Sequence, residues 1–394
     1  MKRIAFIMSS LFACGGEERV VTLIANELSQ FYDVTIYTYE NRKLEGGKKN
    51  NYKLSEKVRV EEVTTENEKF WSKCIKIAYA YTGLTKGKVS QRILKDVFYP
   101  KTHLEEWVDR INREQFDLVI AVSGTYTILL GYIADKITTP CISWEHSSFE
   151  GYFDRHTGYY KNRMEVYKQC ASKLKARVVL NNDIARKYKS ELGLTTCVIP
   201  NPKSFSSEEK ADMSQKCFVT CGRLETEKGY DDLIRAFSAF HKHNKEWKLR
   251  IIGGGRLENS LKLLIQDNKL EDKVEITGYV NEVQENLLKG SVFLMTSRWE
   301  GFPMTITEAL EMGLPVIAYG IPAIEPLVTD GREGIIVQPF NRDEFVQAMI
   351  YIVENENIRK EMSQKAIEKA KTLEPEKVVQ KWITLIDNII SGNK

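Results

Sequence analysis

Residues 291–320 read SVFLMTSRWEGFPMTITEALEMGLPVIAYG, and this stretch predicts a strand, a tight turn, a helix and a second strand. The apolar runs at 291–297 and 315–319 have the length of buried strands. Pro303 suits the first helical position, where a missing backbone N–H leaves no bond unmade, and Gly313 suits the helix end. Short apolar strands separated by a helix are typical of a parallel sheet covered on both faces. The stretch therefore predicts an α/β fold.

The same alternation of strands and helices fills two blocks of the chain. In the first block the strand candidates are 3–8, 33–39, 117–122, 140–145 and 177–181. In the second they are 217–222, 248–253, 273–279, 291–297, 315–319 and 334–338. Residues 201–216 begin with Asn-Pro and are rich in Ser, Lys and Glu, which is typical of a linker. We therefore expect two Rossmann-like lobes, 1–200 and 217–372, whose sheets face each other across a ligand-binding cleft.

Composition excludes several classes of protein. The 394 residues are 42% hydrophobic and 28% charged, as in globular proteins. With 57 basic and 54 acidic side chains, the net charge of +3 argues against a dedicated nucleic-acid binder. No apolar run reaches the roughly 18 residues that a membrane-spanning helix needs. The seven cysteines form no C-x-x-C pair, so we expect free thiols in a reducing compartment, the cytoplasm.

A basic and aromatic insertion interrupts the first lobe at 66–115. Between 69 and 101 the sequence has eight basic residues and one acidic residue, Asp96. Basic helical sequence with interspersed aromatic residues suits an anionic membrane surface. The residues expected to contact such a surface are Lys73, Lys76, Lys88 and Arg92. A solvated helical insertion whose aromatic side chains pack on the first lobe is an equally open interpretation.

Two glutamates in the opening stretch are candidates for ligand binding. Glu300 lies in the turn and Glu308 lies two turns into the helix, so they cannot form a side-by-side acid pair. They can hold two different parts of one extended ligand. The backbone N–H groups near 302–305 form a positive donor cluster that suits hydroxyls or an anion. The alternative is that Glu308 is an ordinary exposed helix residue and Glu300 a turn acid.

A pair of cations follows the first strand of the second block, in CFVTCGRLETEKGYD at 217–231. Arg223 and Lys228 at a strand's carboxyl end, next to a helix N-terminus, could bind phosphate oxygens. They could equally be surface charges with Glu225 and Glu227 as local ion-pair partners.

Two features of the first lobe are also candidates. Gly15 and Gly16 allow the backbone to approach a ligand at the start of a helix. His146 ends an apolar strand at the edge expected to face the cleft, although a lone histidine can equally be structural. The other histidines, 103, 156, 241 and 243, lack metal-ligand spacing, so we expect no metal.

Together these motifs resemble the retaining GT-B glycosyltransferases of family four, also called glycosyl transferases group one. The most specific element is E-x7-E, here EGFPMTITE at 300–308, followed by Ala-Leu and Gly-Leu-Pro-Val-Ile-Ala. The supporting elements are GGxERV at 15–20, VIPNP at 198–202, GRLxxxKG at 222–229 and IxGYV at 276–280. The resemblance covers almost the whole chain. One departure is Glu17, which stands where the family usually has a small residue and adds negative charge near the glycine turn.

The resemblance implies roles for these residues. Glu308 would hold the ribose hydroxyls of a nucleotide-sugar donor, and the backbone near Val280 would meet the base. Arg223 and Lys228 would bind the diphosphate, while Glu300 and the amides of 302–304 would hold sugar hydroxyls. The implied donor-binding residues are Gly15, Gly16, Arg223, Lys228, Val280, Glu300, Gly301, Phe302, Pro303, Met304 and Glu308. His146, beside the transferring sugar, together with Glu300, Arg223 and Lys228 would be catalytic.

The resemblance also implies an activity and a place of action. The enzyme would be a metal-independent retaining hexosyltransferase without a cofactor. It would move a hexose or N-acetylhexosamine, from a UDP-sugar above all, to a saccharide or polyprenyl-diphosphate-linked saccharide acceptor in cell-surface polysaccharide biosynthesis. It would act in the cytoplasm, at the inner face of the plasma membrane, and helix 373–394 would cross back onto the first lobe. The alternative is a non-catalytic nucleotide-sugar-binding partner of a glycosyltransferase.

Overall fold

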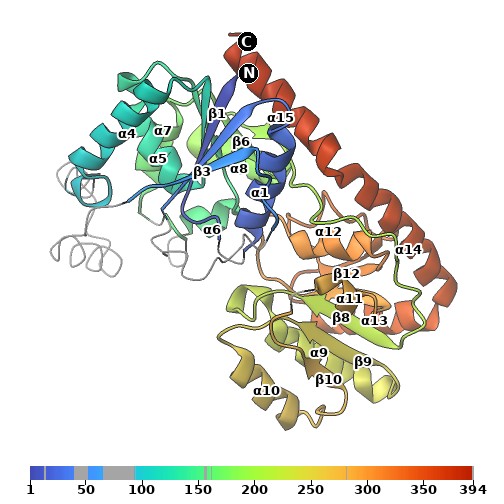
Figure 1. Ribbon diagram of the computed structural model, residues 1–394. Helices are drawn as coiled ribbons and strands as arrows, with labels where there is room; N and C mark the ends of the chain where they lie inside the picture. Colours follow the sequence, from blue (N-terminus) through green and yellow to red (C-terminus); the bar gives the residue numbers. More distant parts are fainter. Residues whose placement is uncertain are drawn as a thin grey trace. The chain divides into compact units, whose positions relative to one another are not determined.

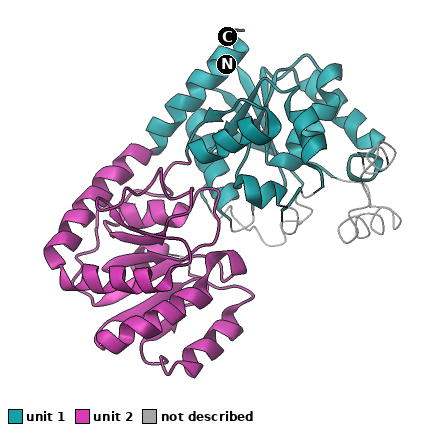
Figure 2. Cartoon of the chain, turned by 180° about the vertical axis from the view of Figure 1, so that it is seen from behind, with its two compact units in different colours: residues 1–200, 375–394 teal, residues 201–374 magenta. Residues whose placement is uncertain are grey.

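The computed structural model describes residues 1–12, 15–39, 52–64, 93, 95–154, 158–160, 162–280 and 282–392. The chain divides into two compact units, one made of residues 1–200 and 375–394 and the other of 201–374 (Figure 2). Each unit contains one sheet, and all pairs between its strands are parallel. This confirms the predicted α/β fold with two parallel-sheet lobes.

The sheet of the first unit has the strand order β3-β2-β1-β4-β5-β6-β7. Its strands are β1 (Arg3–Met8), β2 (Asp33–Thr38), β3 (Val58–Glu62), β4 (Leu118–Val122), β5 (Cys141–Trp144), β6 (Ala176–Val179) and β7 (Cys197–Val198). Its helices are α1 (Gly16–Leu28), α4 (Lys101–Glu114), α5 (Gly124–Ile133), η1 (Ala134–Lys136), α6 (Phe149–Phe153), α7 (Met164–Ala171), α8 (Asn182–Leu192) and α15 (Pro375–Ile390). Every residue of β4 is buried, as expected for a strand covered on both faces.

The sheet of the second unit has the order β10-β9-β8-β11-β12-β13. Its strands are β8 (Cys217–Cys221), β9 (Lys248–Ile252), β10 (Val274–Ile276), β11 (Val292–Met295), β12 (Val316–Tyr319) and β13 (Gly334–Val337). Its helices are η2 (Thr226–Lys228), α9 (Tyr230–His243), α10 (Glu258–Asp267), α11 (Val283–Leu287), α12 (Met304–Glu311), α13 (Arg342–Glu354), α14 (Glu356–Ala370) and η3 (Lys371–Leu373). The strand order reverses direction between β8 and β11, and such a switch point is where ligands bind in open α/β sheets.

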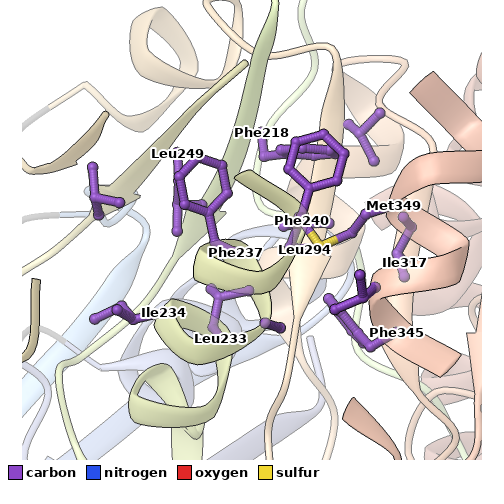
Figure 3. Packing of buried hydrophobic residues seen from close by; sticks show 14 of the residues in the cluster. Phe218, Leu233, Ile234, Phe237, Phe240, Leu249, Leu294, Ile317, Phe345 and Met349 are labelled. Atoms are coloured by element: carbon purple, nitrogen blue, oxygen red, sulfur yellow. The ribbon is translucent and has the colours of Figure 1, made fainter. Parts of the chain in front are cut away.

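An aromatic cluster forms part of the core between the second sheet and α9 (Figure 3). Phe218 of β8 packs edge-on against Phe240 of α9, with 5.1 Å between ring centroids, and lies 4.6 Å from the ring of Trp247. Phe237, one helical turn before Phe240, is fully buried in the same cluster. The apolar face of α9 is thereby fixed on the sheet, and with it the start of the helix at Tyr230.

The structure differs from the sequence-based expectation in two short strands and one segment. Strand β3 has exposed charged residues and β7 has two residues, so neither has the apolar run by which the other strands were identified. Residues 201–216, expected to be a linker, belong to the second unit. Lys203 in this segment is only 2% exposed and is paired with Glu311, so at least one of its charged residues belongs to an internal ion pair.

Part of the basic and aromatic insertion is described. Helix α4 covers its last residues, and Leu104, Trp107 and Ile111 are buried on one face of that helix. This spacing of three or four residues is that of an amphipathic helix packed on a core. Residues 101–114 therefore pack within the first unit, whereas residues 66–92 of the insertion lie outside the described residues.

Helix α15, at the end of the sequence, packs in the first unit beside α1 (Figure 1). Trp382 is fully buried, and its ring centroid lies 4.7 Å from that of Trp144 at the end of β5. Tyr32, shortly after α1, donates its hydroxyl to Asp387 at 2.9 Å. The C-terminal helix thus completes the core of the unit that contains the N-terminus.

Replacing Trp382 with Ala should lower the free energy of unfolding by about 3–5 kcal/mol, because it removes a fully buried aromatic side chain and leaves a cavity. Urea unfolding followed by circular dichroism measures the change. Lys381→Ala, at the neighbouring exposed position of the same helix, should leave stability within about 0.5 kcal/mol of the wild type. Equal effects of the two substitutions would contradict the packing of α15.

Candidate functional site

The candidate site of the second unit lies at the carboxyl edge of its sheet. Strands β8 and β11 are neighbours, and each is followed by a loop that carries a candidate residue. Because carboxyl ends of parallel strands meet at one edge, the loop at 222–229 and the loop at 296–303 lie together. Among the described residues, this is where the structure joins the two sequence motifs.

Lys228 and Glu300 form a direct ion pair in this place. The Nζ atom of Lys228 lies 2.6 Å from Oε1 of Glu300, and their side chains are 16% and 12% exposed. Ser297 donates its hydroxyl to the same carboxylate oxygen at 2.9 Å. The spacing of the two motifs in the sequence does not predict the contact between Lys228 and Glu300, which brings a cation of one motif against a carboxylate of the other.

A glycine permits this contact. Gly229 has φ +66°, which other residues rarely adopt, and a Cβ atom there would lie 2.2 Å from the carbonyl oxygen of Thr296. The hydroxyl of Thr296 donates to the Gly229 carbonyl at 2.9 Å. The turn after η2 is therefore held against the end of β11, and Lys228 is held beside Glu300.

Arg223 has a different environment from Lys228. Its side chain is 62% exposed, and its guanidinium lies 3.4 Å from Glu227. This is the local surface pair that the alternative interpretation expected. Glu225, the other expected partner, pairs with Arg256 instead. The structure thus gives Lys228 a partly buried position at the site and leaves Arg223 exposed at its edge.

The helix after the Glu300 turn begins at Met304, with Pro303 immediately before it. Phe302 and Met304 are buried, 7% and 8% exposed, while Gly301 is half-buried. Glu308 is only 2% exposed, so it is not the ordinary surface residue of the alternative interpretation. Its Oε1 atom accepts a hydrogen bond from the Ser204 hydroxyl at 2.9 Å, a partner that sequence analysis missed because it assigned Ser204 to a linker.

The base-contact candidate Val280 follows β10, the strand at one edge of the same sheet. It is half-buried, and the preceding Tyr279 is 76% exposed. Gly278 pairs with Gly253, which follows β9. Because these strands are parallel, the loops after β8, β9, β10 and β11 all begin at the carboxyl ends of the strands, on one side of the sheet.

In the first unit, His146 is the second residue after the end of β5 at Trp144. Its backbone N–H donates to the hydroxyl of Tyr152 at 3.2 Å, and its ring centroid lies 4.3 Å from that of Trp144. Burial lowers the pKa of His146 to about 3, so the imidazole is neutral at physiological pH. A neutral imidazole can donate at one nitrogen and accept at the other.

The residue before it, Glu145, is a buried carboxyl that no sequence motif singles out. It is 0% exposed and accepts hydrogen bonds from Thr127 at 2.7 Å and Tyr167 at 2.6 Å. Burial raises its pKa, against the effect of these hydrogen bonds. Its place at the end of an apolar strand was the only sequence signal for it.

The glycine turn of the first unit precedes α1, with Gly15 at the N-cap and Gly16 as the first helical residue. Burial, followed by the neighbouring carboxylates of Glu18 and Glu145, raises the pKa of Glu17 to about 8. Glu17 is therefore mostly protonated at neutral pH. The negative charge that its sequence position suggested is largely absent.

The expected membrane-contact residues Lys73, Lys76, Lys88 and Arg92 lie outside the described residues. No helix in the described part of the chain combines the length and the apolar character needed to cross a bilayer. Over the same residues, no three His, Cys, Asp or Glu side chains gather as a metal site would require.

Glu17→Gln should stabilise the protein increasingly as pH rises from 5 to 8. Between pH 4.5 and about 8 the folded chain keeps a proton on Glu17 that the unfolded chain releases, so wild-type stability falls across this window. Gln has no proton to lose. The melting temperature of variant and wild type at each pH measures the effect, and Glu62→Gln, an exposed position on β3, is the matched control. A constant difference between variant and wild type from pH 5 to 8 would refute the raised pKa.

Comparisons with known proteins find one matching family and several similar proteins. Residues 203–369 match the family described as Glycosyl transferases group 1. An uncharacterized glycosyltransferase of Haemophilus influenzae is 26% identical over 97% of this chain and 99% of its own length. A Campylobacter jejuni protein is 26% identical over 99% of both chains, and its name describes it as an alpha-1,4-N-acetyl-D-galactosaminyltransferase acting on an undecaprenol-PP-linked saccharide.

The fold is shared with solved glycosyltransferase structures. A structure of an S. aureus TarM mutant with Fondaparinux, alpha-GlcNAc-glycerol and UDP aligns with a TM-score of 0.75, covering 98% of this chain and 100% of that one at 14% identity. The sequence motifs, the two parallel-sheet units and these matches agree. The chain therefore matches the glycosyl transferases group 1 family over residues 203–369, and its fold is similar to that of solved glycosyltransferase structures.

Proposed function

We propose that the protein transfers a hexose or N-acetylhexosamine from a UDP-sugar to a saccharide acceptor with retention of anomeric configuration. The observation that carries the proposal is the 2.6 Å contact between Lys228 and Glu300 beside the start of α12. It unites a cation suited to a diphosphate with a carboxylate suited to sugar hydroxyls. The UDP in the complex of the similar TarM protein supports this choice of nucleotide.

The proposed reaction begins with the donor bound by its nucleotide and its sugar. Glu308 holds the ribose hydroxyls, the backbone at Val280 meets the base, and Glu300 with the amides near Phe302 holds the sugar. Lys228 binds the diphosphate, and Arg223 is close enough in sequence and exposed enough to join it. The neutral imidazole of His146 is assigned to the transferring sugar, where it can form a hydrogen bond without repelling the developing positive charge.

The bond between the anomeric carbon and the diphosphate oxygen then breaks, and the acceptor oxygen forms a new bond to the same face of that carbon. The acceptor proton passes to the departing diphosphate. Lys228, Arg223 and the first amides of α12 stabilise the negative charge on the leaving group, which is the role that a positioned donor plays in lowering such a barrier. We propose that this charge suffices without a metal, so activity should persist in a chelating buffer.

We further propose that the acceptor is a lipid-linked saccharide, encountered at the cytoplasmic face of a membrane. Support comes from the undecaprenol-linked substrate in the name of the Campylobacter relative. The eight basic residues between 69 and 101 give this chain a sequence feature suited to anionic lipid.

Lys228→Met should weaken UDP binding by roughly 10- to 150-fold, the range expected for a lost hydrogen bond to a charged group. Isothermal titration calorimetry measures the affinity. Lys262→Met removes an exposed lysine that pairs with Glu258 on α10, and it should leave UDP binding unchanged. Equal affinity of Lys228→Met and wild type would overturn the assignment of the diphosphate to this site.

Glu300→Gln should retain UDP binding but lose most sugar transfer, because its carboxylate is assigned to the sugar. Transfer measured with a panel of UDP-sugars should fall about 100-fold or more in kcat/KM. A wild-type protein that binds UDP but transfers no sugar from any donor in the panel would instead favour the non-catalytic binding partner.

Neutralising Lys73, Lys76, Lys88 and Arg92 together should reduce sedimentation with anionic phosphatidylglycerol vesicles, since each basic residue near such a surface contributes about 1 kcal/mol. Vesicles of neutral phosphatidylcholine serve as the control. Absence of wild-type binding to the anionic vesicles would remove the membrane part of the proposal.

A further inference from the structure

Residues 203–211, which we call the strap, run along the helix that carries Glu308. Ser204 donates its hydroxyl to Glu308 at 2.9 Å, and the Ser207 backbone N–H donates to Glu311 at 2.9 Å. The Ala211 N–H donates to the Met312 carbonyl at 2.9 Å. The strap therefore follows α12 from Glu308 to its C-terminal end.

An ion cluster holds the strap in this position. The Nζ atom of Lys203, a residue only 2% exposed, lies 2.6 Å from Glu311 and 2.7 Å from Glu374. Lys210 pairs with the second oxygen of Glu311 at 2.6 Å. Two ammonium groups thus face two carboxylates. Removing one partner of such a set leaves an uncompensated charge, so a change that breaks these ion pairs is unfavourable.

Lys203 also lies near one of the two boundaries at which the chain passes from one unit to the other, and it contacts residues near the second. It lies three residues after Pro200, and its backbone N–H donates to the Leu373 carbonyl at 2.8 Å. Glu374, its ion-pair partner, is the last residue before the chain returns to the first unit at Pro375. One end of the strap is therefore fixed both by its backbone and by its charge.

The bond from Ser204 constrains the carboxylate of Glu308. A carboxylate has about four acceptor positions, and the hydrogen bond from Ser204 to Oε1 takes one of them. Ser204 can therefore fix the rotamer of Glu308 without using the whole acceptor capacity of a carboxylate. A side chain fixed before the ligand arrives loses less conformational entropy on binding.

We infer that Ser204 is a positioning residue for the nucleotide: through its hydrogen bond it fixes Glu308 for the two ribose hydroxyls, and the Lys203–Glu311–Glu374 cluster fixes Ser204. The inference rests on the proposed assignment of Glu308 to the ribose. It gives the segment 203–211, which the sequence suggests to be a linker, a part in donor binding.

The test compares the affinities for UDP and for 2′,3′-dideoxy-UDP, which lacks both ribose hydroxyls. Calorimetry is performed on the wild type and on Ser204→Ala, Ser204→Thr, Glu308→Gln and Ser207→Ala. Ser204→Ala should weaken UDP binding about threefold to tenfold, the usual range for one hydrogen bond, and leave dideoxy-UDP binding unchanged. Ser204→Thr keeps the hydroxyl and should retain the wild-type ratio of the two affinities. Ser207→Ala, the same change within the strap, should alter neither, because the Ser207 hydroxyl donates to Glu209 and not to α12.

The outcomes separate this inference from the proposed function. Suppose that Glu308→Gln abolishes the preference for UDP over dideoxy-UDP but Ser204→Ala preserves it. The role of Ser204 is then refuted, while the assignment of Glu308 to the ribose stands. Equal weakening of both ligands by Ser204→Ala also overturns it, because a general structural effect would not depend on the ribose hydroxyls. A wild type that binds UDP and dideoxy-UDP equally would refute the assignment of Glu308, and the inference with it.

Discussion

The close approach of Gly229 to Thr296 is the constraint on which the site of the second unit depends. A side chain at Gly229 would meet the Thr296 carbonyl at 2.2 Å, so only glycine lets the turn after β8 lie against the end of β11. That approach sets Lys228 and Glu300 at 2.6 Å in a place where both are largely shielded from water. A partly buried pair of this kind is weak evidence for stability, because desolvation offsets much of the attraction. The Lys228–Glu300 pair instead places two opposite charges where one ligand could contact both.

The fold could be predicted because its strands are buried on both faces and therefore appear as apolar runs. Strand β4, LVIAV, is an example, and its neighbours β1 and β5 follow the same rule. Strand β3 could not be predicted in this way, because its exposed charged residues leave it without an apolar run. The Asn-Pro start and the Ser-, Lys- and Glu-rich composition of 201–216 predict a linker, because such polar stretches are usually solvated. The partners that bury Lys203 are 108 and 171 residues away, a distance at which a single sequence carries no pairing signal.

The candidate site was predictable as a set of residues but not as a set of contacts. From their spacing in the sequence, Arg223 and Lys228 are equally good candidates for a phosphate-binding cation. In the structure, Arg223 is exposed and Lys228 lies in the site. Burial decided this difference, and it follows from the turn at Gly229 rather than from either residue's type. Likewise, Glu17 appeared to add charge to the glycine turn, whereas its surroundings raise its pKa to about 8. Environments of this kind depend on residues brought together by the fold.

Helix α12 is bounded at both ends by ammonium–carboxylate contacts. Glu300 and Lys228 lie just before its start, and Lys203 and Lys210 meet Glu311 in its last turn. Cations at a helix C-terminus complement the negative end of its dipole, and their carboxylate partner keeps the local charge balanced. The positive N-terminal end then remains available for an anionic or hydroxyl-bearing ligand. With both ends held and Ser204 bonded between them, Glu308 sits on a short helix that has little freedom to move. Such rigidity is what a carboxylate needs if it is to select two hydroxyls of one ribose by geometry.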